Sequence, residues 1–495
     1  MKPIVWTIAG SDSSGSAGIQ ADLNVFQHLE VQGCSVVTAI TSQNIHEIKA
    51  IEYVSPNHIA AQLTALQKEL KPKAIKIGML GKIETLERIA YFLESYDGPA
   101  VLDPLLFSTS GKALFEADQD FYIKNLTKLF PFIDLLTPNI FEAEKITGQA
   151  IQTHDDIQKC AKKLLSLGVK SVFIKGGHFK NDEMSQDFWS NGSESYWLSH
   201  SRIHKKNVRG TGCVFSSAVA ACLALAYELK EAIVISNMIV HRGIRLSSSF
   251  NKSNSPSFIF HGTWPNEEID LPYLSYSPLK KLPGIFPECN IGLYPIVDSS
   301  EWISKLLPLG VKTIQLRIKN KKGNALAKEI RTSCEYARKY QAHLFINDHW
   351  KIAIQEGAYG VHLGQEDLNF ADITAIYQAG LRLGISTHCY FEVAHAHRYR
   401  PSYIAFGPIY PTTSKRMSFS PQGLFKLKVF RKLLQSYSVV AIGGIDEKNI
   451  IPVLETGVDG AAMISSITKS KDFSQQTKNL LAIVERHQDK KKQMV

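Results

Sequence analysis

The sequence contains no run of about 18 uncharged apolar residues, the length that a membrane-spanning helix needs. The apolar run near the amino terminus is too short for a signal peptide, and Asp12 interrupts it. We therefore expect a cytoplasmic protein with no membrane partner. The seven cysteines are scattered and no two have Cys-x-x-Cys spacing, so neither a zinc site nor a disulfide framework is predicted.

Positive charge is in excess but is not concentrated in one region. The formal net charge is +10 and the pI is near 9.0, yet only residues 319–322 and 489–492 form basic clusters, and we interpret both as solvated lysines. Dispersed positive charge favours small anionic substrates over a nucleic-acid surface. A chain of 495 residues with 44% hydrophobic and 21% charged residues is long enough for two or three globular domains.

Short apolar runs alternate with amphipathic helical stretches in the first half of the sequence. The runs predict buried strands at residues 4–8, 35–38, 74–77, 100–102, 133–136 and 171–174. This alternation predicts an α/β domain with a central, mostly parallel sheet covered by helices on both faces. Polar and glycine residues follow these strands, at the place where open parallel sheets bind their ligands.

Two glycine-rich turns stand out among these polar segments. The turn at residues 9–22, AGSDSSGSAGIQAD, opens a helix but has neither the GxxxxGK[ST] nor the GxGxxG pattern, and a purely structural turn is the alternative. The GTGC turn at residues 210–213 precedes a helix of small residues, so its free N–H groups suit an anion. We expect the helix dipole to lower the pKa of Cys213; a buried, inert cysteine is the alternative.

These turns occur with TSQN, KIGML, DP, TPNIFEAE and KGGH, in that order along the chain. Together the motifs resemble the ribokinase-like family, and most closely the hydroxymethylpyrimidine and phosphomethylpyrimidine kinases of thiamine biosynthesis, over residues 2–250. The sequence departs from the family pattern at Leu105, Leu106 and Val214.

This resemblance implies roles for individual residues. Gln43 would read the aminopyrimidine, Met79 would pack on its ring, and Cys213 would act as the base on the hydroxymethyl group. Lys175 would lie near phosphate. Residues implied to hold ATP and its Mg²⁺, or to stabilise the phosphate charge, are Asn139, Glu142, Gly210, Thr211 and Gly212. The resemblance leaves open a homodimer formed through this half.

The two halves are separated by a segment rich in proline. Six prolines lie between residues 256 and 287, with few periodic stretches, so we expect an irregular connector. The predicted organisation is a ribokinase-like kinase domain at residues 1–265, a linker at 266–288 and a second domain at 289–490.

Eight short apolar strands, each followed by a helix or a loop, are predicted in the second half. They lie at residues 293–297, 313–316, 343–346, 360–363, 382–385, 403–406, 439–442 and 461–464. Eight such repeats in roughly 200 residues predict a TIM (β/α)8 barrel. Polar residues follow strands two to eight, at the ends where barrel active sites are built.

The polar residues at these strand ends suggest phosphate chemistry. Asp348 and Asp367 suit a Mg²⁺ ion shared with substrate phosphates, although a salt-bridged pair is the alternative. Residues 412–416, TTSKR, offer three hydroxyls and two cations to a phosphorylated ligand, with a solvated polar loop as the alternative. Gly443, Gly444 and Ser465 occupy the usual phosphate site of a barrel.

Residues 290–468 resemble thiamine phosphate synthase, on the motifs QLRIK, FINDHW, GAYGVHLGQEDL, GISTH, FGPIYPTTSK, PQGL and AIGGI. The resemblance implies that Asp348 and Asp367 bind Mg²⁺. Implied contacts of the pyrimidine diphosphate are Gln315, Leu316, Arg317, Ile318, Lys319, Asn347, Ser386 and Lys415. Implied contacts of the thiazole phosphate are Thr412, Thr413, Ser414, Gly444, Ile464 and Ser465. The sequence departs from the family pattern at Ile318 and around Cys389 and Tyr390.

The two resemblances together imply a bifunctional transferase of thiamine biosynthesis that acts on small phosphorylated molecules, uses ATP as co-substrate and requires Mg²⁺. Three alternatives stay open: only one half is active, the first half phosphorylates pyridoxal or a sugar, or the chain binds its ligand without catalysis.

Overall fold

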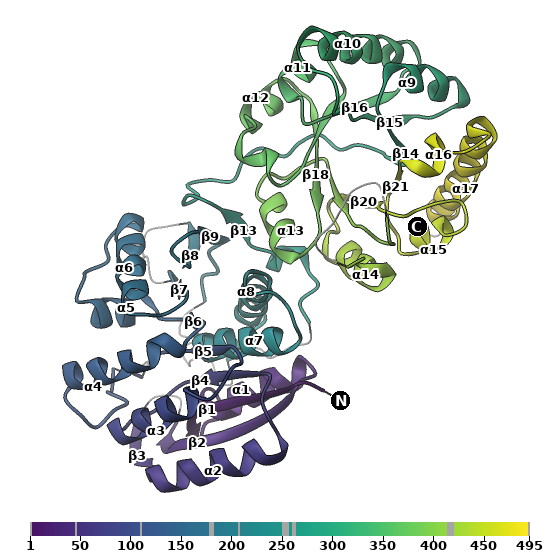
Figure 1. Cartoon of the computed structure of the whole chain (residues 1–495). Coiled ribbons are helices and arrows are strands. Elements are labelled where there is room, and N and C mark those ends of the chain that lie inside the picture. Colours follow the sequence, from purple (N-terminus) through teal and green to yellow (C-terminus); the bar gives the residue numbers. More distant parts are fainter. Residues whose placement is uncertain are drawn as a thin grey trace. The chain divides into compact units, whose positions relative to one another are not determined.

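The computed structural model of the chain describes residues 2–44, 47–108, 111–177, 183–205, 208–249, 257–259, 264–412 and 420–493. The chain divides into two compact units. The first comprises Met1–Pro265 with Asp270–Lys281, and the second comprises Asn266–Ile269 with Leu282–Val495. Figure 1 shows the first unit in purple to teal and the second mainly in green to yellow. In the described part of the chain, no helix has the length and apolar character needed to cross a membrane.

A ten-stranded sheet forms the centre of the first unit (Figure 1). Its order is β13 (Tyr273–Ser275), β9 (Ser195–Ser201), β8 (Met184–Ser190), β7 (Val172–Ile174), β6 (Leu135–Leu136), β5 (Ala100–Leu102), β4 (Ala74–Ile77), β1 (Ile4–Asp12), β2 (Gln32–Gln43) and β3 (Ile48–Tyr53). The strands from β7 to β2 are parallel, and the remaining pairs are antiparallel. The mostly parallel sheet that the sequence predicts is therefore confirmed, with antiparallel strands added at both edges.

Helices cover this sheet, and neighbouring helices pack on one another. They are α1 (Gly18–His28), α2 (Pro56–Glu69), α3 (Ile83–Leu93), α4 (Gln119–Leu126), α5 (Ile140–Thr147), α6 (His154–Ser166), α7 (Thr211–Ala224) and α8 (Leu229–Arg245). Helices α1, α7 and α8 pack together, as do α2, α3 and α4 (Figure 1). Residues 213–222 of α7 are all buried, because small side chains allow neighbouring elements to approach the helix from every side. This packing fixes the start of α7 deep in the unit.

Short elements complete the first unit. A small sheet joins β10 (Val208–Arg209), β12 (Ser257–Phe258) and β11 (Ser248–Ser249), and the 3-10 turns η1 and η2 span Thr127–Phe132 and Glu268–Asp270. Strand β13 belongs to the segment that joins the two halves, and it pairs antiparallel with β9. The joining segment therefore contributes a strand to the sheet of the first unit, in addition to irregular chain.

The second unit is a closed barrel of eight parallel strands, which confirms the predicted TIM barrel. In order around the barrel the strands are β14 (Gly292–Val297), β15 (Thr313–Leu316), β16 (His343–Asn347), β17 (Gly360–Leu363), β18 (Arg382–Thr387), β19 (Tyr403–Phe406), β20 (Ser438–Ile442) and β21 (Gly460–Met463). Each predicted strand lies within two residues of an observed one. Buried barrel strands are easy to locate because both faces are apolar and turn residues bound them.

Helices surround the barrel, and side chains fill it. The helices are α9 (Ser300–Leu306), α10 (Gly323–Lys339), α11 (Trp350–Gln355), α12 (Ile373–Gln378), α13 (Tyr390–His397), α14 (Gly423–Leu433), α15 (Ile450–Glu455), α16 (Ser465–Thr468) and α17 (Phe473–Gln493), with 3-10 turns η3 (Leu307–Leu309) and η4 (Asp367–Asn369). Tyr294, Phe345 and Tyr403 meet edge to face inside the barrel. The interior is thus a packed core, and ligands must bind at its carboxyl-terminal mouth.

Candidate active sites

A cavity of roughly 680 Å³ in the first unit is lined by every residue predicted for the kinase site. It lies at the carboxyl ends of the parallel strands, where the sheet brings distant motifs together. The predicted residues that line it are Gln43, Met79, Asn139, Glu142, Lys175, Gly210, Thr211, Gly212 and Cys213. The motifs therefore form one site, although they are spread over 170 residues of sequence, from 43 to 213.

The two glycine-rich turns meet at one wall of this cavity. Gly210 precedes α7 with φ +84°, and a Cβ atom there would lie 2.4 Å from the carbonyl oxygen of Ser16. In the first turn, the carboxylate of Asp12 accepts hydrogen bonds from the backbone N–H groups of Ser14, Ser16 and Ala17. The Asp12 carboxylate thus stabilises the glycine-rich turn to which it belongs. This turn contacts the residue that precedes α7.

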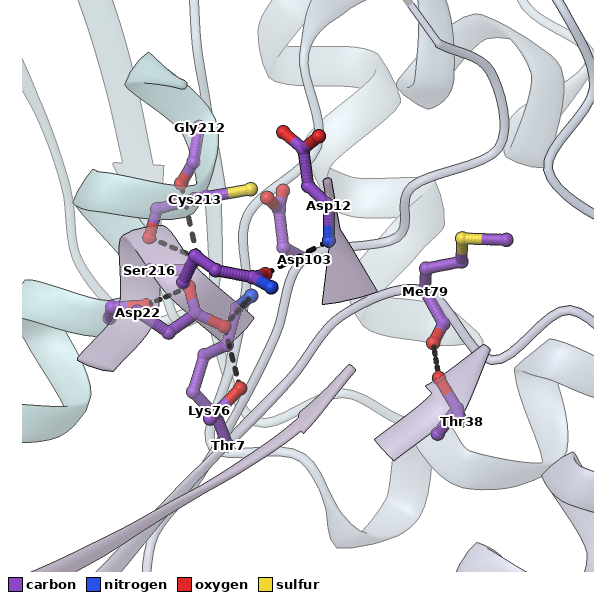
Figure 2. Close-up of polar contacts among 12 residues, drawn as sticks. Thr7, Asp12, Asp22, Thr38, Lys76, Met79, Asp103, Gly212, Cys213 and Ser216 are labelled. Carbon is purple, nitrogen blue, oxygen red and sulfur yellow. Dashed lines mark hydrogen bonds and ion pairs between the residues drawn. The ribbon is translucent and has the colours of Figure 1, made fainter. Parts of the chain in front are cut away.

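A buried ion pair lies beneath Cys213. The ammonium of Lys76 lies 2.8 Å from the carboxylate of Asp22, and both side chains are completely buried (Figure 2). Thr7 and Ser217 donate further hydrogen bonds to Asp22, at 2.6 and 2.5 Å. Burial would lower the pKa of Lys76, but the charge and hydrogen bond of Asp22, together with the charges of other nearby groups such as Asp103, outweigh it and raise the pKa, so Lys76 is an ammonium ion. Asp22 and Lys76 belong to two of the sequence motifs described above, but the motifs themselves indicate no role for either residue.

A second ion pair joins Lys175 to Asp103. The ammonium lies 2.9 Å from one carboxylate oxygen of Asp103, which also accepts a 3.2 Å hydrogen bond from Thr137. The other oxygen of Asp103 is buried and has no hydrogen-bond partner in the described part of the chain. It lies 3.3 Å from the position that a Cβ atom on Gly212 would take. Asp103 therefore belongs to the site, a role that the DP motif alone did not reveal.

Cys213 lies in the first turn of α7 and is 5% exposed. Burial raises the pKa of its thiol to about 11, although the charge of Lys76 acts in the opposite direction. The expectation that the helix dipole lowers this pKa is therefore wrong, because the packing that surrounds α7 removes the thiol from water. The thiol is protonated at neutral pH, and its activation has to come from charges brought close to it.

Asn139 and Glu142 build the start of α5 as a capping box. The side chain of Asn139 accepts the N–H of Glu142 at 2.9 Å, and the carboxylate of Glu142 accepts the N–H of Asn139 at 2.8 Å. Burial raises the pKa of Glu142 to about 7, an effect that Lys175 reduces and Asp103 reinforces. Positive charge brought close to Glu142 would lower its pKa again.

The predicted pyrimidine contacts Gln43 and Met79 also line the cavity. The backbone N–H of Gln43 donates to the hydroxyl of Ser13 at 2.9 Å, and that hydroxyl donates to the backbone carbonyl of Gln43 at 2.8 Å. Met79 packs with Ala39 and Leu114, and Leu105 packs against the same cluster. Leu105, where the sequence departs from the family pattern, thus supplies apolar surface beside Met79 and lines the cavity.

In the barrel, Asp348 and Asp367 come together at the ends of neighbouring strands. Asp348 follows β16 with φ +63°, and Asp367 accepts the N–H of Gly364 at 2.9 Å. Burial and the charge of Asp367 raise the pKa of Asp348 to about 6. Two carboxylates that share a hydrogen bond suit a divalent cation, whose charge would relieve their repulsion. The described residues contain no cluster of three or more His, Cys, Asp or Glu side chains arranged for a metal ion.

A buried polar ladder crosses the barrel interior and ends on two predicted site residues. Gln315 donates to the hydroxyl of Tyr294 at 3.0 Å, and the hydroxyls of Tyr294 and Tyr403 are 2.8 Å apart. His362 contacts Tyr403 through Nδ1 and Ser386 through Nε2, both at 2.8 Å. Burial lowers the pKa of His362 to about 3, so its ring is neutral. The three middle residues of this ladder, Tyr294, Tyr403 and His362, were not predicted. The sequence indicates them only as polar side chains within otherwise apolar strands.

The remaining predicted barrel residues differ in how exposed their side chains are. Leu316 is 2% exposed and alternates with the inward-facing Gln315, so only its backbone can reach a ligand. Ile318 is also buried, whereas Lys319 is exposed. Asn347 ends β16 next to Asp348. Predicted residues Thr413, Ser414 and Lys415 lie outside the described residues.

The turn after β20 contacts the segment that leads to Thr412. Gly444 has φ +66°, and a Cβ atom there would lie 2.6 Å from the carbonyl oxygen of Pro411. Ile464 packs against the barrel core, and Ser465 begins α16. Because β20 and β21 are adjacent in the barrel, Gly444 and Ser465 follow neighbouring strand ends.

The stretch around Cys389 that departs from the family pattern forms helix α13. Its buried side chains pack inward: Tyr390 lies against Phe430, and His397 contacts the hydroxyl of Tyr437 at 2.7 Å. His395 contacts Gln365 at 2.9 Å. Burial lowers the pKa of His395 to about 4 and that of His397 to about 3. This histidine-rich stretch therefore supports the barrel wall as neutral, packed rings.

The fold and the two sites define an α/β unit and a barrel unit that each gather polar groups suited to phosphorylated ligands. Comparison with known families distinguishes the two. Residues 12–257 match the phosphomethylpyrimidine kinase family, and residues 293–467 match the thiamine monophosphate synthase family. The second match is supported by thiamine-phosphate synthases of Photorhabdus laumondii, 54% identical over 198 residues, and Proteus mirabilis, 52% identical over 198 residues. Each alignment covers 40% of this chain and 92% of the relative.

Solved structures similar to the first unit include two kinases. A phosphomethylpyrimidine kinase from Clostridium difficile is 37% identical, with 48% of this chain and 98% of that chain covered and a TM-score of 0.43. A Bacillus subtilis pyridoxal kinase in an ADP complex is 32% identical, with 52% and 97% covered and a TM-score of 0.47. The chain belongs to the phosphomethylpyrimidine kinase family in its first half and to the thiamine-phosphate synthase family in its second half. The expected bifunctional transferase of thiamine biosynthesis is thereby confirmed.

Proposed function

We propose that the first unit phosphorylates 4-amino-5-hydroxymethyl-2-methylpyrimidine and then its monophosphate with MgATP. The barrel then joins the resulting diphosphate to a thiazole phosphate, and thiamine phosphate and diphosphate are the products. The observation that carries the kinase assignment is the single cavity lined by every residue that the pyrimidine-kinase pattern implies, with Cys213 and Lys175 on it.

In the kinase reaction, Gln43 and Met79 orient the pyrimidine, and the hydroxymethyl oxygen attacks the γ-phosphorus of ATP. Cys213, as its thiolate, takes the proton of that hydroxyl as the new O–P bond forms and ADP departs. The charge of Lys76 acts in favour of the thiolate, but burial outweighs it and keeps the pKa of the thiol at about 11, so Cys213 needs further positive charge close by before it acts as the base. Lys175 and the amides of Gly210, Thr211 and Gly212 stabilise the charge on the transferred phosphoryl group.

Asn139 and Glu142 would hold Mg²⁺ together with the ATP phosphates. The fit is favourable because burial raises the pKa of Glu142 to about 7, so an approaching cation would replace the proton on a carboxyl group that water does not solvate. When bound, the cation supplies charge neutralisation for the phosphates.

In the barrel reaction, the bond between the pyrimidine methylene carbon and the diphosphate oxygen breaks, and the thiazole nitrogen forms the new C–N bond. The electron-rich aminopyrimidine stabilises positive charge on the methylene carbon as diphosphate departs. Gln315, Arg317 and Lys319 bind the diphosphate together with Asn347, Ser386 and Lys415, and the backbone of Leu316 and Ile318 completes that contact. The main contribution of the protein is orientation and charge stabilisation.

Asp348 and Asp367 would hold Mg²⁺ with oxygens of the diphosphate as further ligands, which neutralises the leaving group. Thr412, Thr413, Ser414, Gly444, Ile464 and Ser465 hold the thiazole phosphate in this proposal. We further propose a cytoplasmic location, where ATP is available, and a homodimer formed through the first unit, which light scattering of the purified chain would test.

The experiment that tests the proposal is one incubation of the purified chain with hydroxymethylpyrimidine, ATP, Mg²⁺ and thiazole phosphate, followed by mass analysis. Thiamine phosphate is the expected product. Accumulation of the pyrimidine diphosphate without thiamine phosphate would contradict the barrel assignment. Phosphorylation of pyridoxal, but not of the pyrimidine, in a parallel incubation would contradict the kinase assignment.

A further inference from the structure

A buried carboxylate holds the backbone directly after Lys175. The N–H of Gly176 donates to Oδ1 of Asp187 at 2.8 Å. Gly176 lies so close to β8 that a Cβ atom on it would be 1.8 Å from the carbonyl oxygen of Gln186. On the other side, the N–H of Lys175 donates to the carbonyl of Pro138 at 2.9 Å. The backbone that carries Lys175 is thus fixed between β8 and the segment leading to α5.

The side chain of Asn237 holds Asp187, and His200 in turn holds Asn237. Asn237, on α8, donates from its amide nitrogen to Oδ2 of Asp187 at 2.9 Å. The amide oxygen of Asn237 therefore faces Nε2 of His200, 2.5 Å away, and that nitrogen must carry the hydrogen. The hydrogen bonds run from His200 to Asn237 and from Asn237 to Asp187, which also accepts from Gly176. With Asp187 ionised, every contact in this chain has one donor and one acceptor.

This network reaches from the cavity to the segment that joins the two halves. Asp187 and Asn237 line the cavity, whereas His200 stacks on His241 with ring centres 4.1 Å apart. His241 contacts the buried carboxylate of Asp270 through Nδ1 at 2.8 Å. Asp270 lies outside both family matches, which end at residue 257 and begin at residue 293. The joining segment therefore forms the far end of the network.

We propose that Asp187 is a positioning residue of the kinase reaction, because it fixes Gly176 and thereby holds the ammonium of Lys175 at the phosphate end of the cavity. Asn237 and His200 keep Asp187 in that orientation. This inference rests on the proposed role of Lys175 in phosphoryl transfer. It predicts that the geometry of the hydrogen bonds matters, and that a negative charge at position 187 itself does not.

Exchanging the two side chains tests this distinction in the full-length chain. Asp187→Asn alone brings two amide nitrogens face to face, and Asn237→Asp alone brings two carboxylates together. The double variant D187N/N237D restores every bond, since the new asparagine accepts from Gly176 and donates to the new aspartate, which accepts from His200. Each single change is expected to lower kcat/KM for MgATP by about 100-fold, as a misplacement near 1 Å can do. The double change is expected to recover most of that loss.

Two internal controls separate positioning from folding. Synthase activity of the same preparations, supplied directly with the pyrimidine diphosphate, should stay at the wild-type level. Asp134→Asn removes another partly buried carboxylate of the first unit, which accepts the N–H of Ala100 at 2.9 Å and does not line the cavity. It should lower the melting temperature and leave the KM for MgATP unchanged.

Three results would overturn the inference. The first is a folded single variant with wild-type kinetics. The second is a double variant as inactive as the single ones, which would mean that the charge of Asp187 acts directly on the ligand. The third comes from calorimetric titration with MgATP alone, which needs no pyrimidine: equal affinity in the wild type and both single variants. Wild-type activity on the pyrimidine decides the proposed function separately.

Discussion

Charges of opposite sign are paired in the kinase site, whereas two charges of like sign meet in the barrel site. Lys76 lies 2.8 Å from Asp22 and Lys175 lies 2.9 Å from Asp103. In the barrel, burial and then the charge of Asp367 raise the pKa of Asp348. These two ion pairs thus neutralise their charges within the protein, while the carboxylate pair depends on protons or a cation for relief. The comparison implies that cations affect the second site more strongly.

The largest expected effect is the separate loss of each activity. Cys213→Ala should reduce pyrimidine phosphorylation by about 10³-fold or more, and Asp348→Ala should do the same to thiamine phosphate formation. Each variant should keep the other activity, measured with its own substrate. A folded variant that lost both activities would contradict the two-site description.

Breaking the buried ion pair should have the next largest effect. Lys76→Met leaves the carboxylate of Asp22 buried without its counter-ion, and should lower the free energy of unfolding of the first unit by about 3–5 kcal/mol. Denaturant unfolding measures the change. The matched control is Lys170→Met, which removes an exposed lysine from its 2.9 Å contact with Asp134 and should cost less than about 1 kcal/mol. Equal losses would mean that burial of the pair has no energetic weight.

The carboxylate pair should make cation binding in the barrel depend on pH. The pKa of Asp348 is raised from 3.8 to about 6, so between these values the folded state binds more protons than the unfolded state. Its contribution to stability is therefore present below pH 3.8 and is lost as the pH rises through 6. Mg²⁺ competes with the proton, so synthase kcat/KM should fall below pH 6, and more Mg²⁺ should move that fall to lower pH. An inflection that ignores Mg²⁺, or that persists in Asp348→Asn, would contradict this.

The smallest effect compares two capping boxes within the first unit. Asn139 with Glu142 starts α5 at the cavity, and Thr153 with Asp156 starts α6 without lining it. Replacing either cap by alanine should cost about 1 kcal/mol of stability. Only Asn139→Ala should also raise the KM for MgATP. Similar KM changes in both variants would show that the cavity senses helix stability in general.

Part of this architecture could be predicted because strong local patterns coincide with the fold. Barrel strands such as Tyr403–Phe406 are apolar on both faces, and the polar residues after them must gather at one end of the barrel. Strands β3 and β8 mix polar and apolar residues, so no such pattern distinguishes them. The positions of Asp187 and Asn237 depend on pairing across distant elements, which a single sequence does not reveal. Likewise, the raised pKa of Cys213 follows from packing density around α7 rather than from its place in a helix.

The pairing of β13 with β9 bears on how the two enzymes could be separated. Strand β13 covers backbone groups of β9 that would otherwise present an open sheet edge, a template for association with other chains. A kinase fragment that stopped where its family match ends, at residue 257, would lose this cover together with Asp270. A gene designed to express the kinase alone should therefore extend to Lys281, where the first compact unit ends. The joining segment up to Lys281 belongs largely to the first compact unit, so the end of the kinase family match is not the end of the kinase unit.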